Sequence, residues 1–128
     1  MMRSGTLLAA AAIVAAGLAQ AFAAEPAKTM ETSLGVVLAD SKGMTLYVFD
    51  KDTPGVSNCY DKCAANWPPL AAPADAMAMG EWTVVERKDG TRMWAYKGMP
   101  LYTFVKDKAP GDVAGDGFKG VWHVVKEQ

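Results

Sequence analysis

The chain contains one phrase twice, and this internal repeat constrains its fold more than any other feature of the sequence. Residues 42–52 read KGMTLYVFDKD and residues 97–107 read KGMPLYTFVKD, so that eight of eleven positions are identical at a constant shift of 55. The same shift aligns Trp67 with Trp122 without a gap. A match of this length indicates an internal duplication, and it predicts two structurally equivalent units in tandem.

The pattern within each unit is that of short β-strands. Residues 46–49 and 101–104 are rich in aromatic and β-branched side chains, which suit a pleated surface better than a helix. Their expected partners in hairpins are residues 34–38 and 93–96, which lie ahead of turns that contain glycine. A further hairpin is predicted around Asp89-Gly90, since this dipeptide favours a tight turn between residues 82–86 and the strand that follows.

Signals for helix are sparse, and only residues 61–67 and 74–79 favour a short helical turn. We therefore predict an all-β or mostly β domain with seven to nine short strands. Its two units, at about residues 35–70 and 89–125, are antiparallel hairpins that share one core, because a single hairpin is marginally stable in water.

The first 23 residues have the features of a secretory signal peptide. Arg3 precedes an uncharged apolar run, and Ala21-Phe22-Ala23 places small side chains where signal peptidase needs them. A membrane anchor is the alternative, but the run is shorter than the ~20 residues that span a bilayer. We expect residues 24–128 to form a single domain, without a membrane span, in the periplasm or the medium.

Cysteine and charge content narrow the class of protein further. Cys59 and Cys63 are the only cysteines, and in an oxidising compartment we expect them to form a local disulfide. Their CxxxC spacing differs from the CxxC of a thioredoxin-like pair and from a c-type haem site. With 13 basic and 14 acidic residues, the chain has no basic excess that would attract nucleic acid or an anionic membrane.

Both phrases satisfy the pattern Yx(F/W/Y)xxD, through Tyr47, Phe49 and Asp52 in the first unit and Tyr102, Phe104 and Asp107 in the second. This resembles the bacterial family of predicted secreted lipoproteins with that motif, also called the secreted repeat of unknown function. The segments CYDKCAANWPPL and GDGFKGVWHVV extend the likeness over nearly all of residues 24–128. The resemblance implies an exported, lipoprotein-like repeat protein and brings no reaction with it. The lipobox cysteine of many members is missing here.

The motif aspartates lie where each predicted strand gives way to a turn. Asp52 and Asp107 are expected to accept hydrogen bonds from backbone amides of the turns that follow. A calcium site formed with Asp61, Asp112 and Asp116 is the alternative, although neither loop has the pattern of an EF-hand.

Soft-metal binding is a second open alternative. Met77 and Met79 form an MxM element between the units, and thioethers suit Cu(I), with His123 as a further possible ligand. Methionine is also a flexible core residue, and a lone histidine in a strand is commonly structural. The four tryptophans are expected in the core, whereas an exposed pair would indicate a binding groove.

The sequence offers no set of catalytic residues. His123 is the only histidine, and no hydroxyl motif such as GxSxG accompanies it, so no triad can be assembled. We predict a protein that is not an enzyme and needs no cofactor. It would act as a non-catalytic binding or envelope-associated module, whose partner is an unknown envelope protein or a small ligand. The alternative function is that of a periplasmic copper-binding or redox accessory protein.

Overall fold

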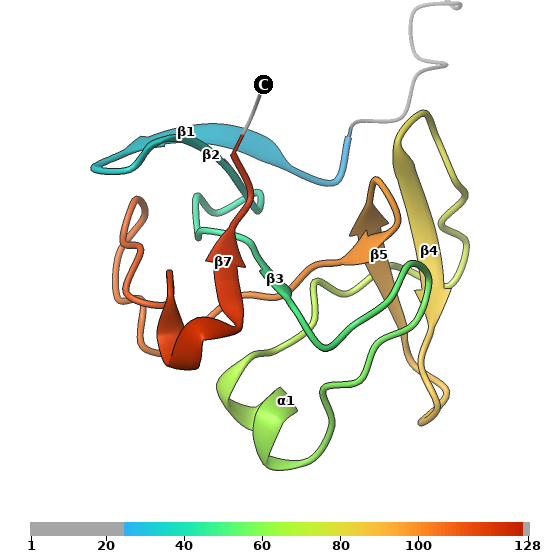
Figure 1. Cartoon of the computed structure of the whole chain (residues 1–128). Helices are drawn as coiled ribbons and strands as arrows, with labels where there is room; N and C mark the ends of the chain where they lie inside the picture. The colour runs from blue at the N-terminus through green and yellow to red at the C-terminus, as the bar shows by residue number, and fades with distance from the viewer. Residues whose placement is uncertain (1–24, 127–128) are drawn as a thin grey trace, which may run out of the picture.

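The computed structural model describes residues 25–126 and confirms a mostly β architecture (Figure 1). Its elements, in chain order, are β1 (Lys28–Thr32), β2 (Gly35–Ala39), β3 (Tyr47–Phe49), α1 (Lys62–Asn66), β4 (Trp82–Glu86), β5 (Arg92–Tyr96), β6 (Met99–Pro100), the 3-10 turn η2 (Phe118–Gly120) and β7 (Trp122–Val124). The predicted signal peptide, residues 1–23, lies outside the described residues. Within the part described, no helix has the length and apolar character needed to cross a membrane.

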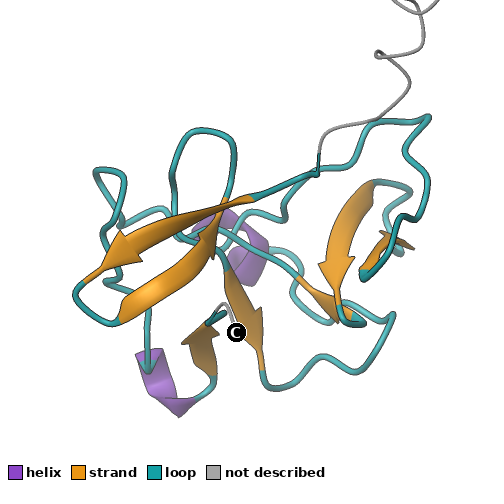
Figure 2. Ribbon diagram, turned by 90° about the horizontal axis from the view of Figure 1, so that it is seen from above, coloured by secondary structure: helices purple, strands orange, loops and turns teal. Residues whose placement is uncertain are grey.

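The strands form three small antiparallel sheets, with the orders β1-β2, β3-β7 and β4-β5-β6. Figures 1 and 2 show the β1-β2 and β4-β5 hairpins on opposite sides of the central β3-β7 pair. The pair β3-β7 joins a strand of the first unit to a strand of the second. The two units are therefore interleaved in the middle of the molecule.

The duplication is preserved in the hydrogen bonds of the backbone. Hairpin β1-β2 in the first unit corresponds to β4-β5 in the second, and α1 corresponds to η2. The bridge between Ala39 and Thr45 matches the one between Ala95 and Pro100. At the junction, the amide of Tyr47 donates to the carbonyl of Tyr102 (2.8 Å), and the amide of Tyr102 donates back to Tyr47 (3.0 Å). This reciprocal pair marks a pseudo-twofold axis between the units.

The strand predicted at residues 101–104 is reduced to isolated bridges in the structure. Tyr102 is bridged to Tyr47 on one side and to Pro69 on the other. In the first unit the equivalent strand, β3, pairs in register with β7, whose His123 and Val124 occupy the positions equivalent to Pro68 and Pro69. Proline has no N–H to donate, so a regular ladder cannot form in the second unit.

Two other predictions of local structure were wrong. Residues 74–79 form no helix: the Arg92 guanidinium donates to the carbonyls of Pro73 (3.2 Å), Ala74 and Ala76 (3.3 Å), which holds the segment as an irregular turn. The first hairpin partner of residues 34–38 is β1, a strand that the sequence did not reveal because its side chains are largely polar and exposed. The predicted pairing of residues 34–38 with 46–49 is kept only near the turn, through the Ala39–Thr45 bridge and a hydrogen bond from Leu46 N–H to the Leu38 carbonyl (3.0 Å).

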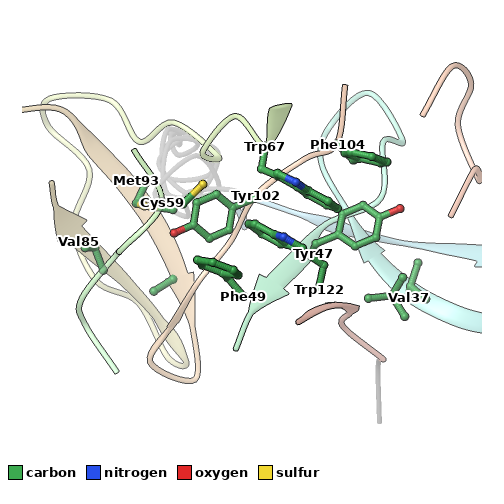
Figure 3. Packing of buried hydrophobic residues seen from close by; sticks show 12 residues of the cluster. Val37, Tyr47, Phe49, Cys59, Trp67, Val85, Met93, Tyr102, Phe104 and Trp122 are labelled. Carbon is green, nitrogen blue, oxygen red and sulfur yellow. The ribbon is translucent and has the colours of Figure 1, made fainter. Parts of the chain in front are cut away.

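The core has two buried clusters. The larger cluster lies between the units, and its centre is formed by Tyr47, Phe49, Trp67, Tyr102, Phe104 and Trp122 (Figure 3). The second cluster contains Trp82 and Trp94 together with Leu38, Leu46 and Leu101. All four tryptophans are buried, as expected from the sequence. The larger cluster positions the polar motif residues and the groove described below.

Candidate binding site

The motif residues of each unit are completed by the other unit. The Tyr47 hydroxyl donates to Oδ2 of Asp107 (2.7 Å), and the Tyr102 hydroxyl donates to Oδ2 of Asp52 (2.6 Å). Both tyrosines are fully buried, and each aspartate is 5% exposed. The repeated motif is therefore an interlock between the two units, with each tyrosine and aspartate bonded across the pseudo-twofold axis.

The second oxygen of each carboxylate accepts a backbone amide from the loop that follows it. Asp52 Oδ1 accepts from Asn58 N (2.7 Å), and Asp107 Oδ1 accepts from Ala114 N (2.9 Å). The sequence predicted this kind of bond to the turn, but it did not predict the tyrosine partner. Because each carboxylate receives two short hydrogen bonds, its burial is compensated by donors from both units.

Burial dominates the electrostatics of these groups. Loss of hydration raises the pKa of Asp52 and of Asp107, and the hydrogen bonds from tyrosine and backbone only partly oppose it. The nearby Asp112 carboxylate adds to the rise in the pKa of Asp107. The pKa values of Tyr47 and Tyr102 are raised as well, mainly by burial and by the adjacent carboxylates, so both hydroxyls stay protonated and act as donors.

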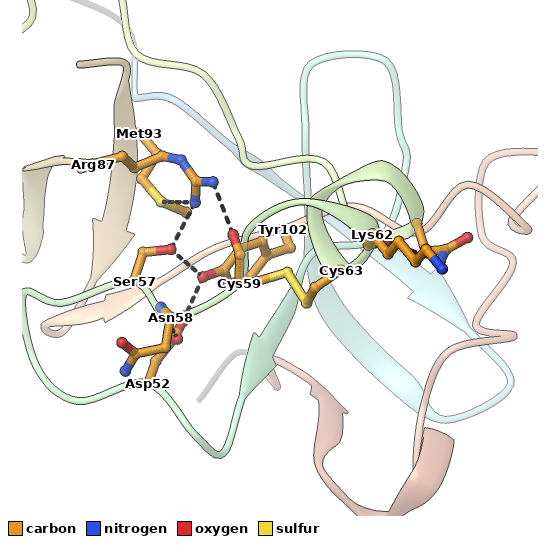
Figure 4. The surroundings of a disulfide bond; sticks show 10 residues. Asp52, Ser57, Asn58, Cys59, Lys62, Cys63, Arg87, Met93 and Tyr102 are labelled. Atoms are coloured by element: carbon orange, nitrogen blue, oxygen red, sulfur yellow. Dashed lines mark hydrogen bonds between the residues drawn. A yellow bond between two sulfur atoms is a disulfide. The ribbon is translucent and has the colours of Figure 1, made fainter. Parts of the chain in front are cut away.

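A buried arginine supports one of the two interlocks. Arg87 Nη1 donates to Ser57 Oγ (2.7 Å), which lies 2.7 Å from the Tyr102 hydroxyl (Figure 4). Arginine can only donate and an ionised carboxylate can only accept, so the hydrogens run from Arg87 through Ser57 and Tyr102 to Asp52. Two hydroxyls thus connect a buried cation to a buried anion. The Tyr47 hydroxyl instead accepts from the Gly115 amide (3.1 Å), and its hydrogen bonds within residues 25–126 involve no cation.

The disulfide of the first unit lies beside the arginine, which comes from the second unit. Cys59 and Cys63 are joined by an S–S bond of 2.04 Å, and the Cys59 carbonyl accepts from Arg87 Nη2 (2.8 Å) (Figure 4). The equivalent positions in the second unit are Ala114 and Phe118. The disulfide is therefore a feature of one unit, in keeping with a role in shaping the loop that follows Asp52.

Four aromatic rings form a continuous stack through the pseudo-twofold axis. Trp67 and Trp122 lie face to face at the centre, with ring centroids 3.8 Å apart and planes within 3° of parallel. Phe104 covers the outer face of Trp67 at 3.9 Å, and Phe49 covers that of Trp122 at 4.2 Å. Figure 3 shows the rings packed together with the motif tyrosines. Since both indole faces are covered, the two indoles can present only ring edges to their surroundings.

A groove of about 460 Å³ opens over the edges of this stack. Ten of its lining residues form five pairs related by the duplication, listed as Phe49 with Phe104, Lys51 with Lys106, Cys63 with Phe118, Asn66 with Val121 and Trp67 with Trp122. The remaining lining residues are Lys62 on α1 and Lys119 on η2. We call this site the lysine groove. It lies across the pseudo-twofold axis, and each unit contributes two lysines.

All of the charged side chains that line the lysine groove are positive. Its lining contains four lysines and no acidic residue. Among residues 25–126 the ion pairs are Arg87 with Asp89 and His123 with Asp50, so none of the four ammonium groups is paired in the region described. A second groove, lined by Lys28 but also by Glu25 and Glu81, has both signs. The lysine groove is therefore a concentration of positive charge in a chain whose formal net charge is −1.

The structure places the residues considered for metal binding in different surroundings. Met77 is 76% exposed, and Met79 packs against the second cluster beside Trp82. His123 lies in β7, where its Nε2 is 2.9 Å from Oδ2 of Asp50. In residues 25–126 no three histidine, cysteine or acidic side chains are grouped as metal ligands would be. Asp112 and Asp116, considered for calcium, accept backbone amides of Lys108, Ala109 and Val124.

The groove lysines were missed by the sequence analysis, although part of the signal was present. Lys51 and Lys106 are identical positions in the repeated phrase, directly before the motif aspartates. Lys62 and Lys119 are not equivalent in sequence, and only the packing of α1 and η2 beside the ring stack brings them to the same groove. Arg87 was also missed, because its burial depends on a contact with a loop 30 residues away.

Comparison with known proteins bears on both the duplication and the cellular location. The family described as "Secreted repeat of unknown function" matches residues 28–71 and, separately, residues 83–126. These two matches coincide with the two structural units, and they confirm the predicted family and the two copies. No curated protein and no solved structure matches the chain.

Proposed function

We propose that this chain, which belongs to the family of secreted repeats of unknown function, is an exported, non-catalytic binding module whose ligand surface is the lysine groove. The observation that carries the proposal is the groove itself. It is concave, has a volume in the range of small-molecule sites, and combines an apolar aromatic floor with unpaired charges. It is also built from both copies of the repeat, which gives the duplication a purpose beyond stability.

The placement of the polar residues supports a role without catalysis. Asp52 and Asp107 are buried, and both oxygens of each already accept hydrogen bonds, so neither carboxylate is presented to a substrate. Ser57 lies in the buried chain between Arg87 and Tyr102. His123 is bonded to Asp50, a carboxylate, rather than to a hydroxyl or thiol that it could activate.

A location in the periplasm or the medium fits this role. The features of residues 1–23 favour export, and a disulfide between Cys59 and Cys63 is suited to an oxidising compartment. We propose that the protein acts there on a small ligand of the cell envelope or its surroundings.

Indole N–H signals provide a direct test, because the four tryptophans divide evenly between the two clusters. In a screen of anionic, neutral and cationic fragments, at least one fragment should shift the signals of Trp67 and Trp122 while Trp94 stays unchanged. Fragments that shift only Trp82 and Trp94, or no shift of Trp67 and Trp122 with any fragment, would contradict the proposal.

A further inference from the structure

The lysine groove also indicates which class of ligand it binds, an inference that depends on the proposed function. We propose that the groove binds a small dianion with an anionic group at each end and an apolar body between them. The argument rests on the sign of its charges, on the chemistry of its floor and on its place across the pseudo-twofold axis.

The charges select for anions. Four lysines line the groove, no acidic residue lines it, and none of the four forms an ion pair within residues 25–126. After the first 23 residues the chain has 12 basic side chains, so a third of them line this groove. An anion bound here would meet positive charge without displacing an ion-pair partner of these lysines and without repulsion from a carboxylate in the lining.

The floor suits the apolar body of such a ligand. Because the stack covers both faces of Trp67 and of Trp122, these rings turn their edges toward the groove. Ring edges carry the positive part of the aromatic quadrupole, so they accept hydrocarbon and do not repel an anion. A cationic ligand would need exposed ring faces, and the two central rings offer none.

The symmetry of the site requires two anionic groups. Lys51 and Lys62 come from the first unit, whereas Lys106 and Lys119 come from the second. Phe49 and Phe104 form the two ends of the ring stack, and each is followed two residues later by a groove lysine, Lys51 or Lys106. Lys119 belongs with the Phe104 end, because its neighbour Phe118 packs on Phe104 with ring centroids 5.4 Å apart. A ligand with a single charge could engage only one pair at a time. A ligand with a charge at each end can engage both pairs while its centre lies over the indole edges.

The backbone at Lys119 allows its charge to be removed at little cost to the fold. Lys119 has φ of 50°, a left-handed conformation that glycine and asparagine adopt more easily than lysine. Lys97, which does not line the groove, has the same conformation (φ of 52°), so the backbone alone does not mark a binding residue. Asparagine at position 119 would keep this backbone and remove one of the four groove cations.

Two pairs of acids test the inference by calorimetric titration at low ionic strength. Suberate and octanoate have chains of the same length, and terephthalate and benzoate share one ring, but only the first acid of each pair is a dianion. We expect each dianion to bind more tightly than its monoanion partner and to shift the indole signals of Trp67 and Trp122. The hydrophobic effect alone would favour octanoate over suberate, so the order of these two is decisive.

Variants with matched charge separate the groove from the rest of the surface. Lys51→Gln and Lys106→Gln should each weaken suberate binding by a similar factor, roughly two- to fivefold for an exposed charge pair, and the double variant should bind suberate no better than octanoate. Lys42→Gln with Lys97→Gln is the control, because these lysines are also related by the repeat but do not line the groove. Lys119→Asn should weaken binding without lowering the melting temperature.

Octanoate binding as tightly as suberate, or equal effects from the groove and control pairs, would overturn the inference. If neutral or cationic fragments still shift Trp67 and Trp122 in that case, the groove remains a binding site for another class of ligand. If no compound of any charge shifts them, the proposed function fails together with the inference.

Discussion

The reciprocal bonds between Tyr47 and Asp107 and between Tyr102 and Asp52 predict a specific pattern of energetic coupling. Each of these bonds joins a neutral donor to a buried carboxylate, and a hydrogen bond to a charged group is worth about 1.5 to 3 kcal/mol. In double-mutant cycles made of Tyr→Phe and Asp→Ala, we therefore expect a coupling of about 1 to 3 kcal/mol within each of these two pairs.

The repeat supplies its own control for these cycles. Tyr47 with Asp52, and Tyr102 with Asp107, are the same residue types within one unit, but they share no hydrogen bond. For these pairs, the losses in free energy of unfolding caused by the two single substitutions should add up to the loss in the double variant, to within about 0.5 kcal/mol. Urea unfolding at neutral pH measures all of the variants, with comparison at the midpoints to limit extrapolation error.

Two outcomes would refute this account of the motif. Coupling of equal size within the units and between them would mean that tyrosine and aspartate act through general packing of the core. Additivity in the pairs that cross between units would mean that the hydrogen bonds contribute nothing net, so that the motif is retained for another reason.

Three further predictions concern charge and packing. Because burial raises the pKa of Asp107 in the folded state, the folded protein binds a proton at this site more readily than the unfolded chain does. The wild type should therefore gain stability relative to Asp107→Asn as the pH falls from neutral toward the ordinary aspartate value, near 3.9. Urea unfolding at both ends of this pH range measures the difference, and a relative loss of stability on acidification would contradict the burial argument. Arg87→Met should lower the free energy of unfolding by about 1 to 3 kcal/mol, because the Ser57 hydroxyl and a buried carbonyl lose their donor, whereas Lys88→Met on the exposed neighbour should have little effect. Gly115→Ala should cost about 1 to 3 kcal/mol, since the added methyl would lie 2.6 Å from Cη2 of Trp67, and Trp67→Phe in the same chain should recover part of the loss in thermal melts.

The duplication made much of this fold predictable. The constant shift of 55 residues placed Tyr47, Phe49 and Trp67 in register with Tyr102, Phe104 and Trp122, and the structure keeps these pairs related by its pseudo-twofold axis. The hairpin around Asp89-Gly90 was also correctly predicted from its turn residues. Local signals of this kind are strong, because turn geometry and alternation depend on neighbours in the chain.

The contacts between the units were not predictable in the same way. A tyrosine five residues before an aspartate gives no sign that its partner is in the other copy, because that choice depends on how the two units pack. The loss of the strand around Tyr102 could have been predicted from the sequence. Its partner segment contains Pro68 and Pro69, which have no backbone N–H to donate to a regular ladder. The polar strand β1 has no apolar periodicity, so its place is decided mainly by its backbone pairing with β2, which lies later in the chain.

The tyrosine–aspartate bonds between the units also indicate how a chain with a single copy of the repeat would be stabilised. A single unit has its own tyrosine and its own aspartate, but in this arrangement they cannot satisfy each other, so the unit would bury both only by meeting a second copy. An ancestral chain with one repeat would in that case be a homodimer whose stability rises with protein concentration. Fusion through residues 72–81 replaces that encounter with an intramolecular one. Fusion also allows the two units to diverge in sequence, as the disulfide of the first unit and Arg87 of the second show.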